Sequence, residues 1–231
     1  MKNQTVFRVG LVVCATLNVM LQAQPTTAAL KEFTIIIREG TRTLPGGSWQ
    51  NSVMFYAQRS DGSWAKGPYA SSDQTAHGSV RSVLFRPNGQ RVLVDDTQRL
   101  KSTRNVSLSP LEARAADPMC GLSSIGPKLK PRYKGTVQIM GFKAVIIETQ
   151  EGPLLHTDWK SPDLDCYEIK TTEERRDDAG ELIGQFEREA VDIKTVTPDP
   201  KYFTIPEEYR EASPSEMEAA RRARFGISTL R

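Results

Sequence analysis

The sequence predicts a mainly β protein with one curved antiparallel sheet of about eight to ten strands, resembling a half-barrel. A C-terminal helix and few other helices complete the fold. Runs rich in β-branched and aromatic residues recur between clusters of Gly, Pro, Asn and Asp. No strand pattern alternates with a long helical pattern, as a parallel α/β sheet would require. Near the C-terminus, a helix-capping sequence precedes a helical pattern.

The first strands are predicted in the N-terminal third of the chain. Residues 33–38 (FTIIIR) form a β-branched run, and residues 53–59 form another. The second run is followed by Asp61-Gly62 and then by Trp64. Asp-Gly between two such runs indicates a hairpin, because both residues tolerate a positive φ.

The clearest hairpin lies within residues 79–95, around a Pro-Asn-Gly loop. A two-residue Asn-Gly turn would place Arg86 opposite Arg91, and like charges directly opposite destabilise a sheet. A three-residue loop with the glycine in the left-handed region avoids this pair. The predicted register then places Leu84 opposite Val92.

The second half of the chain is predicted to contain two more hairpins. Residues 100–134 hold scattered Ser, Pro and Gly, so we expect little regular structure there. Strands resume at residues 135–139 and 143–148, and a last large hairpin joins residues 167–173 and 185–193. Charged and apolar residues partly alternate in this hairpin, which favours one solvated face.

A terminal helix is predicted for residues 214–225. Ser213 and Glu216 have the spacing of a capping box, and Pro214 suits the first helical position. Apolar residues at near-helical spacing are expected to pack on the sheet: Met217, Ala220 and Phe225.

Residues 1–23 are typical of a secretory signal peptide. Lys2 and Arg8 supply a charged start, residues 9–21 are mostly apolar, and small residues follow. A transmembrane anchor is the alternative. Thirteen residues rise only about 20 Å as a helix, too little for a bilayer core of about 30 Å.

Export predicts a secreted or periplasmic protein. Cleavage is expected after Ala23, with Ala29 as the second choice, leaving residues 24–231 as a single β-rich domain. Removal of the leader lowers the formal net charge from +3 to about +1, which gives no general reason to bind nucleic acid. No later stretch reaches the apolar length of a membrane span, so we expect no stable membrane insertion.

The sequence offers no convergent catalytic, cofactor-binding or metal-binding set. His77 and His156 lack a second histidine or cysteine at ligand spacing and are interpreted as exposed loop residues. Asp158, Asp163 and Asp165 lie close together, but no glycine interrupts them as in a calcium loop, so they are interpreted as acidic turn residues.

Cys120 and Cys166 are predicted to form a disulfide. Cys14 lies in the leader, so the exported chain keeps two cysteines in an oxidising compartment. A redox-active pair would usually show Cys-x-x-Cys, and a metal site would need further ligands. The stretch WKSPDLDCYEIK around Cys166 is therefore interpreted as a structural staple.

The C-terminal half carries three short motifs: Trp159-x-Ser-Pro162-Asp163-Leu-x-Cys166, Pro198-Asp-Pro-x-x-Phe203-x-Ile-Pro206-x-x-Tyr209 and Pro214-Ser-Glu216. Together they resemble a group of uncharacterised secreted proteins of soil bacteria. The Phe-x-Ile-Pro-x-x-Tyr ending is also similar to periplasmic half-barrels of the lipoprotein-carrier type. The resemblance covers roughly residues 135–226 and implies a curved antiparallel sheet wrapped on a helix. It supplies no catalytic residue.

These observations favour an exported, non-enzymatic binding module without a cofactor. A curved sheet offers a concave side for an unknown apolar ligand or a protein segment. The alternative is a structural or envelope protein that recognises a partner through a sheet edge or the terminal helix. A hydrolase is a minor alternative, because no nucleophile elbow or oriented base is visible.

Overall fold

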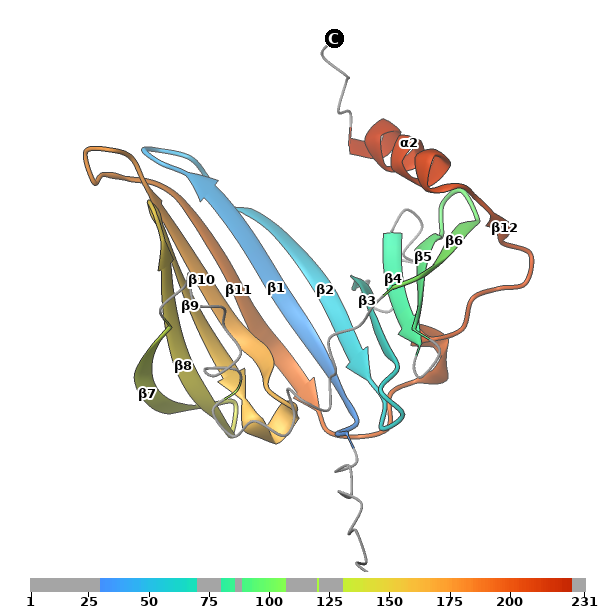
Figure 1. The fold of residues 1–231 in the computed structure, drawn as a ribbon, viewed down its shortest axis with the longest axis horizontal. Coiled ribbons are helices and arrows are strands. Elements are labelled where there is room, and N and C mark those ends of the chain that lie inside the picture. The colour runs from blue at the N-terminus through green and yellow to red at the C-terminus, as the bar shows by residue number, and fades with distance from the viewer. Residues whose placement is uncertain (1–29, 70–79, 86–88, 107–119, 121–130, 226–231) are drawn as a thin grey trace, which may run out of the picture.

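The structure is a computed structural model that describes residues 30–69, 80–85, 89–106, 120 and 131–225. Within these residues, twelve strands form one open sheet (Figure 1). The first six are β1 (Phe33–Thr43), β2 (Gln50–Gln58), β3 (Trp64–Pro68), β4 (Val80–Phe85), β5 (Gln90–Asp95) and β6 (Leu100–Asn105). The others are β7 (Arg132–Ile139), β8 (Phe142–Glu151), β9 (Leu154–Ser161), β10 (Tyr167–Arg176), β11 (Leu182–Lys194) and β12 (Arg210–Glu211).

β1 lies in the middle of the sheet and separates two arms. The strand order is β12-β6-β5-β4-β3-β2-β1-β11-β10-β9-β8-β7. One arm runs from β2 to β6, and the other runs from β11 back to β7 (Figure 1). The described pairs are antiparallel except β12 with β6, which is parallel over two residues. The predicted mainly β, curved antiparallel sheet is confirmed, with more strands than expected.

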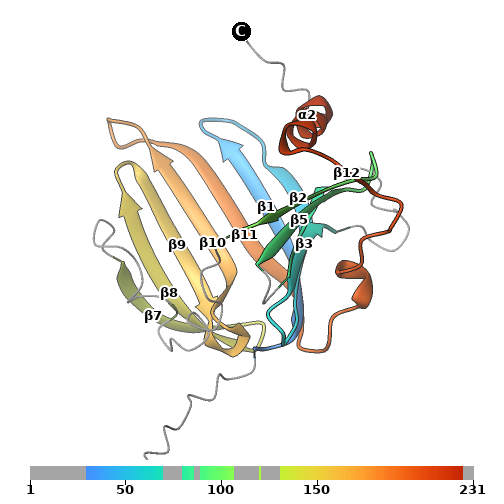
Figure 2. The same ribbon diagram turned by 45° about the vertical axis from the view of Figure 1, so that its right-hand side comes forward.

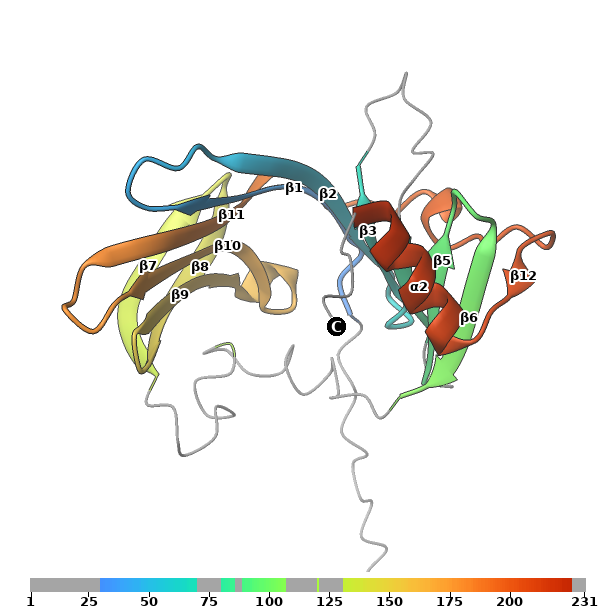
Figure 3. The same cartoon turned by 90° about the horizontal axis from the view of Figure 1, so that it is seen from above.

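The sheet bends toward one of its faces. The rings of Tyr56 on β2 and Tyr167 on β10 lie 4.2 Å apart between centroids. β1 and β11 separate these strands, so in a flat sheet the two strands would be about 14 Å apart. The sheet therefore curls toward the face that carries Tyr56, Phe33, Ile35 and Ile37 (Figure 3). We call this the inner face, and the opposite one the outer face.

β1 is buried on both faces at its apolar end. Phe33, Ile35 and Ile37 are at most 2% exposed on the inner face. Ile36 points to the outer face and joins a second cluster there, which contains Phe55, Ala57, Ala65, Val83 and Phe203. A central strand covered on both sides reads as a continuous apolar run, which is why residues 33–38 stand out in the sequence.

The chain after β11 passes from the outer to the inner face around the β6 edge. η2 (Pro200–Tyr202) leads into Phe203, which is buried in the outer-face cluster. β12 then pairs with β6. α2 (Pro214–Phe225) follows and lies over the β5–β6 end of the sheet (Figures 2 and 3). We call the segment from η2 to α2 the C-terminal clasp.

α2 packs on the sheet, as the sequence predicted, and it does so on the inner face. Its buried contacts form a cluster of Leu100, Ala212, Met217 and Ala220, with Leu93 at the margin. Leu93 belongs to a paired row that leads through Lys66 to Tyr56, which places it on the inner face. The side chain of Phe225 lies outside the part of the chain whose side chains are described.

The predicted capping box begins this helix. The backbone N–H of Glu216 donates to Oγ of Ser213 at 3.2 Å, and Glu216 Oε2 accepts from the Ser213 N–H at 2.8 Å. Two otherwise unpaired donors of the first turn are thereby satisfied. Arg210 adds its guanidinium to the same carboxylate at 3.1 Å.

Three sequence-based expectations are wrong. β9 was expected to be a turn region, and β6 was expected to be irregular, yet both are strands. The hairpin register is also shifted by one residue, because Val83 faces Val92 and Phe85 faces Gln90. Val83 and Val92 are both buried, so this register gathers the apolar residues of β4 and β5 on one face.

Among the described residues, none of the helices has the length and apolar character needed to cross a bilayer. The predicted leader and both expected cleavage positions lie outside the described residues.

Candidate functional site

A row of polar residues crosses the inner face over four strands. Asp158 of β9 is paired with Thr171 of β10. Thr171 is paired with Arg188 of β11, which is paired with Glu39 of β1. Glu39 follows Ile37 by two residues, so the row lies on the inner face. Asp158 is 7% and Thr171 3% exposed, so charged and polar groups are buried where an apolar lining was expected.

His156 lies between two carboxylates of this face. Its Nε2 is 2.9 Å from Oδ1 of Asp158, and its Nδ1 is 3.1 Å from Oε1 of Glu173. Both ring nitrogens can donate only when the imidazole is protonated. The geometry is therefore that of an imidazolium held by two anions.

The pKa shifts of His156 and Asp158 support a protonated imidazole. The hydrogen bond to Asp158 is the main cause that raises the pKa of His156, against an opposing effect of burial, and the charge of Glu173 adds to the increase. Burial alone would raise the pKa of Asp158. The hydrogen bond from His156 and the charge of Lys160 outweigh burial and lower the pKa of Asp158.

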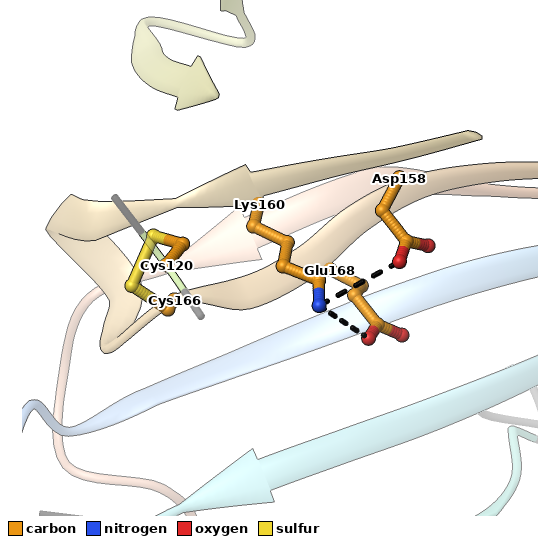
Figure 4. The surroundings of a disulfide bond; sticks show 5 residues. All are labelled: Cys120, Asp158, Lys160, Cys166 and Glu168. Carbon is orange, nitrogen blue, oxygen red and sulfur yellow. Dashed lines mark ion pairs between the residues drawn. A yellow bond between two sulfur atoms is a disulfide. The ribbon is translucent and has the colours of Figure 1, made fainter. Parts of the chain in front are cut away.

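The polar network continues toward the disulfide. Lys160 Nζ lies 3.6 Å from a carboxylate oxygen of Asp158 and 3.6 Å from one of Glu168 (Figure 4). Arg188 donates through Nη2 to Oε2 of Glu168 at 2.5 Å. With His156 protonated, three cations face three carboxylates: His156, Lys160 and Arg188 against Asp158, Glu168 and Glu173. The network is then electrically balanced, which lowers the cost of its partial burial.

The two cysteines lie beside this network. Their Sγ atoms are 2.11 Å apart, at disulfide distance (Figure 4). Cys120 and Cys166 are 1% exposed and cluster with Val145 and Ile147 of β8. Ile147 is paired with Asp158, so this contact is on the inner face. A bond between them would fasten residue 120 to the inner face next to the charged row.

A pocket of about 510 Å³ opens next to His156, near the ends of β8 to β11. Its apolar lining consists of Pro153, Leu154 and Phe186, and its charged lining consists of Arg42, Glu151, Glu173 and Arg175, with Gly184 and Gln185 between them. Glu173 is paired with both His156 and Phe186, which places the charged network and the pocket on one row. The volume is in the range of small-molecule sites.

The residues of the resemblance motifs are spread over the fold and do not line this pocket. Trp159 lies on β9, with Lys170 Nζ 5.6 Å from its ring centroid. Pro162 begins η1 (Pro162–Leu164), and Asp163 Oδ2 accepts from the backbone N–H of Lys143 at 3.1 Å. These contacts fix the turn that leads into Cys166.

The other motif residues belong to the C-terminal clasp. Phe203 packs under the guanidinium of Arg59, whose central carbon is 4.1 Å from the ring centroid. Pro206 accepts a backbone hydrogen bond from Tyr209, whose hydroxyl donates to Asp96 at 3.0 Å. In the structure, these contacts hold the clasp against the sheet.

Two interpretations of polar residues require correction. His156 is a half-buried strand residue, and Asp158 is a buried one, so neither lies in an exposed loop or turn. His156, Asp158 and Lys160 recur at every second position, and this period is the signal that could have placed them on one face of a strand. Asp163 and Asp165 do lie in a turn, around η1. His77 lies outside the described residues.

His156 is not placed to act as a general base. Both nitrogens of His156 face carboxylates, so neither is free to take a proton from a nucleophile. Over the part of the chain that the structure describes, no three His, Cys, Asp or Glu side chains form a group that could hold a metal ion.

No protein-family model matches the sequence, and no curated protein matches it. Among solved structures, PNGF-II is similar with a TM-score of 0.46 and 11% identity, over 82% of this chain and 33% of that one. The chain thus spans about a third of the length of PNGF-II. The MucA/MucB complex of Pseudomonas aeruginosa gives a TM-score of 0.41 and 13% identity, over 78% and 57%. A LolA superfamily protein from Nitrosomonas europaea gives 0.28 and 12%, over 75% and 90%. Scores of this size assign the chain to none of these families.

Proposed function

We propose that the chain is an exported, non-enzymatic binding module that holds an amphipathic ligand in the inner-face pocket. The observation that carries the proposal is the lining of this pocket. Pro153, Leu154 and Phe186 offer apolar surface in the same pocket as Arg175. Such a lining suits a ligand with an apolar body and a charged end.

Arg175 favours a ligand with an anionic end. Glu173 is engaged by His156, and Arg42 donates to the neutral amide of Gln185. Arg175 has no ion-pair partner among the described residues. The guanidinium of Arg42 lies over Trp49 on the outer face, so Arg175 is the arginine available to a ligand in this pocket. A carboxylate or phosphate on the ligand would gain charge-assisted hydrogen bonds from Arg175.

A fluorescent fatty-acid analogue with a free carboxylate is the appropriate probe. Titration into the mature protein should give saturable binding at one site per chain. An uncharged ester of the same dye should bind about tenfold more weakly, because one charge-assisted contact is lost.

Gly184 offers a direct way to fill the pocket. A Cβ at this position would make only ordinary contacts, 3.8 Å from the carbonyl oxygen of Arg42 and 3.9 Å from Cβ of Arg175. Gly184→Leu should therefore fold normally and exclude the dye. Arg175→Gln should weaken binding, whereas Arg222→Gln on the exposed side of α2 serves as the charge-matched control. Unchanged binding in Gly184→Leu, or no saturable binding to the parent protein, would overturn the proposal.

One observation favours a second function, recognition of a partner protein at the β7 edge. β7 ends the sheet, and six of its eight residues are exposed. Val137 is 41% exposed. An extended segment of another protein could add a strand there. A photo-crosslinker at Val137 should capture a defined partner in the native compartment, and recovery of only self-crosslinks would count against this function.

A further inference from the structure

An exposed tryptophan on the outer face is held in one orientation. Trp49 stands just before β2 and is 37% exposed. It lies over Gly40 of β1, where a Cβ would be only 2.9 Å from Cε3 of the indole. The guanidinium carbon of Arg42 is 4.9 Å from the ring centroid, and Arg42 Nε donates to Oε1 of Gln185 at 2.7 Å. An aromatic ring positioned in this way is preorganised while part of it stays open to solvent.

A pocket of about 230 Å³ lies beside this ring. Its lining residues are Arg38, Gly40, Trp49, Asn51 and Glu187. Gly40 is paired with Asn51 on β2 and with Glu187 on β11, so these residues form one row across three neighbouring strands (Figure 1). The absence of a side chain at Gly40 leaves room for the Asn51 amide, whose Oδ1 would lie 2.5 Å from a Cβ there.

The polar side chains that line this pocket have hydrogen-bond donors and acceptors that the described part of the protein leaves unused. Among the described residues, the amide of Asn51 and the indole N–H of Trp49 have no hydrogen-bond partner. Arg38 uses one nitrogen on Glu189 at 3.3 Å. Glu187 uses one oxygen on Lys170 at 3.3 Å. The lining therefore offers both donors and acceptors that are not fully used within the described chain.

The chemistry of the lining selects the class of ligand. The charges of Arg38 and Glu187 cancel, so neither an anion nor a cation is favoured. Hydroxyl groups both donate and accept, and thus suit a lining that offers donors and acceptors together. The indole adds an apolar surface for a ring of C–H groups. The volume lies below that of sites for drug-sized ligands, which start at about 300 Å³.

We infer that this outer-face pocket is a second binding site, specific for a neutral carbohydrate. One sugar ring lies against Trp49, and its hydroxyls are hydrogen-bonded by Asn51, Glu187 and Arg38. The site is on the opposite face of the sheet from the amphiphile pocket and does not depend on the function proposed for it.

The test is calorimetric titration of the mature protein with a panel of neutral sugars: glucose, galactose, mannose, N-acetylglucosamine and their short oligomers. At least one should bind saturably at one site, with a dissociation constant of about 1 mM or tighter. Trp49→Ala and Asn51→Ala should each weaken that binding about tenfold or more. Asn51 is exposed, so its variant keeps the test valid if Trp49→Ala fails to fold.

Two control variants separate this site from the rest of the surface. Tyr69→Ala removes another exposed aromatic ring, 39% exposed, and should leave sugar binding unchanged. Gly184→Leu should abolish dye binding on the inner face and also leave sugar binding unchanged. No binding by any neutral sugar up to about 20 mM would overturn the inference. Binding only of charged sugars, or binding that Trp49→Ala leaves intact, would overturn it as well.

Discussion

Nε2 of His156 lies 2.9 Å from Oδ1 of Asp158 on the inner face of β9. The second ring nitrogen faces Glu173, so the protonated imidazole joins two strands, β9 and β10. A neutral imidazole has only one N–H, and would leave one of the two carboxylates facing a lone pair. Glu173 is the more exposed of the two and is the partner expected to separate first.

The first prediction is that stability falls as pH rises through the raised pKa of His156. The pKa of His156 is raised above 6.5, so its stabilising contribution is complete below that value and is lost as pH rises through the raised pKa. The pKa of Asp158 is lowered below 3.8, so its contribution is present above that value and is lost as pH falls through the lowered pKa. The pair should contribute most between about pH 4 and 6.5.

Denaturant unfolding between about pH 5 and 9 measures this effect, because this interval includes the usual histidine pKa of about 6.5. The free energy of unfolding should decline with pH more steeply for the parent than for His156→Gln. Proton NMR supplies the direct check, because His156 should titrate above 6.5. A His156 that titrates at or below that value would contradict the prediction.

The second prediction concerns the Cys120–Cys166 bond. Their separation in sequence is 46 residues, and closing such a loop stabilises by about 4 kcal/mol at most on the chain-entropy model. Reduction and alkylation, or Cys166→Ser, should lower the free energy of unfolding by up to that amount. Thiol labelling of denatured, unreduced protein from its native compartment should find no free thiols. Two thiols per chain would disprove the pairing.

The third prediction compares two glycines. A Cβ at Gly40 would lie 2.5 Å from Asn51 Oδ1 and 2.9 Å from Trp49, so Gly40→Ala must displace both side chains. We expect a loss of about 1–3 kcal/mol and a change in tryptophan fluorescence. Gly184→Ala on β11 meets only ordinary contacts and should change stability by less than about 0.5 kcal/mol. Equal effects in the two variants would show that crowding at Gly40 is not the cause.

The fourth prediction is that the clasp stabilises the sheet. Met217 is 6% exposed and packs with Leu100 and Ala220, so Met217→Ala should cost about 2–3 kcal/mol. Arg222→Ala on the exposed side of the same helix should cost far less. Truncation after Pro206 removes both β12 and α2, and should lower the melting temperature more than either substitution. A truncated protein with the parent's melting temperature would refute the packing role.

Local signals predicted the elements whose buried face is apolar. The β-branched run of β1, the hairpin of β10 and β11, and the capping box of α2 are all present. In each of these elements, one short stretch of sequence is enough to specify the local structure. β9 was missed because its inner face carries His156, Asp158 and Lys160, so its polar residues point inward.

Long-range features lay beyond the sequence alone. The pairing of β1 with β11 and the meeting of His156 with Glu173 depend on strand order, which no local pattern specifies. The outer-face pocket was missed for the same reason, because Gly40, Asn51 and Glu187 come from three strands. The Val83–Val92 register was predicted wrongly because the argument considered only the repulsion between Arg86 and Arg91 next to the loop. Burial of apolar side chains acts along the whole hairpin and sets its register.

The central position of β1 has a consequence for the order of folding. β1 must pair with β11, and the contact between Arg38 and Glu189 joins residues 151 apart. Each arm can form its own hairpins early, but the two arms cannot join until nearly the whole chain has been synthesised. Contacts between residues so far apart in the sequence slow folding, because the intervening chain must be ordered before β1 and β11 can pair. A chain built in this way stays incompletely folded until the residues of β11 have emerged from the ribosome.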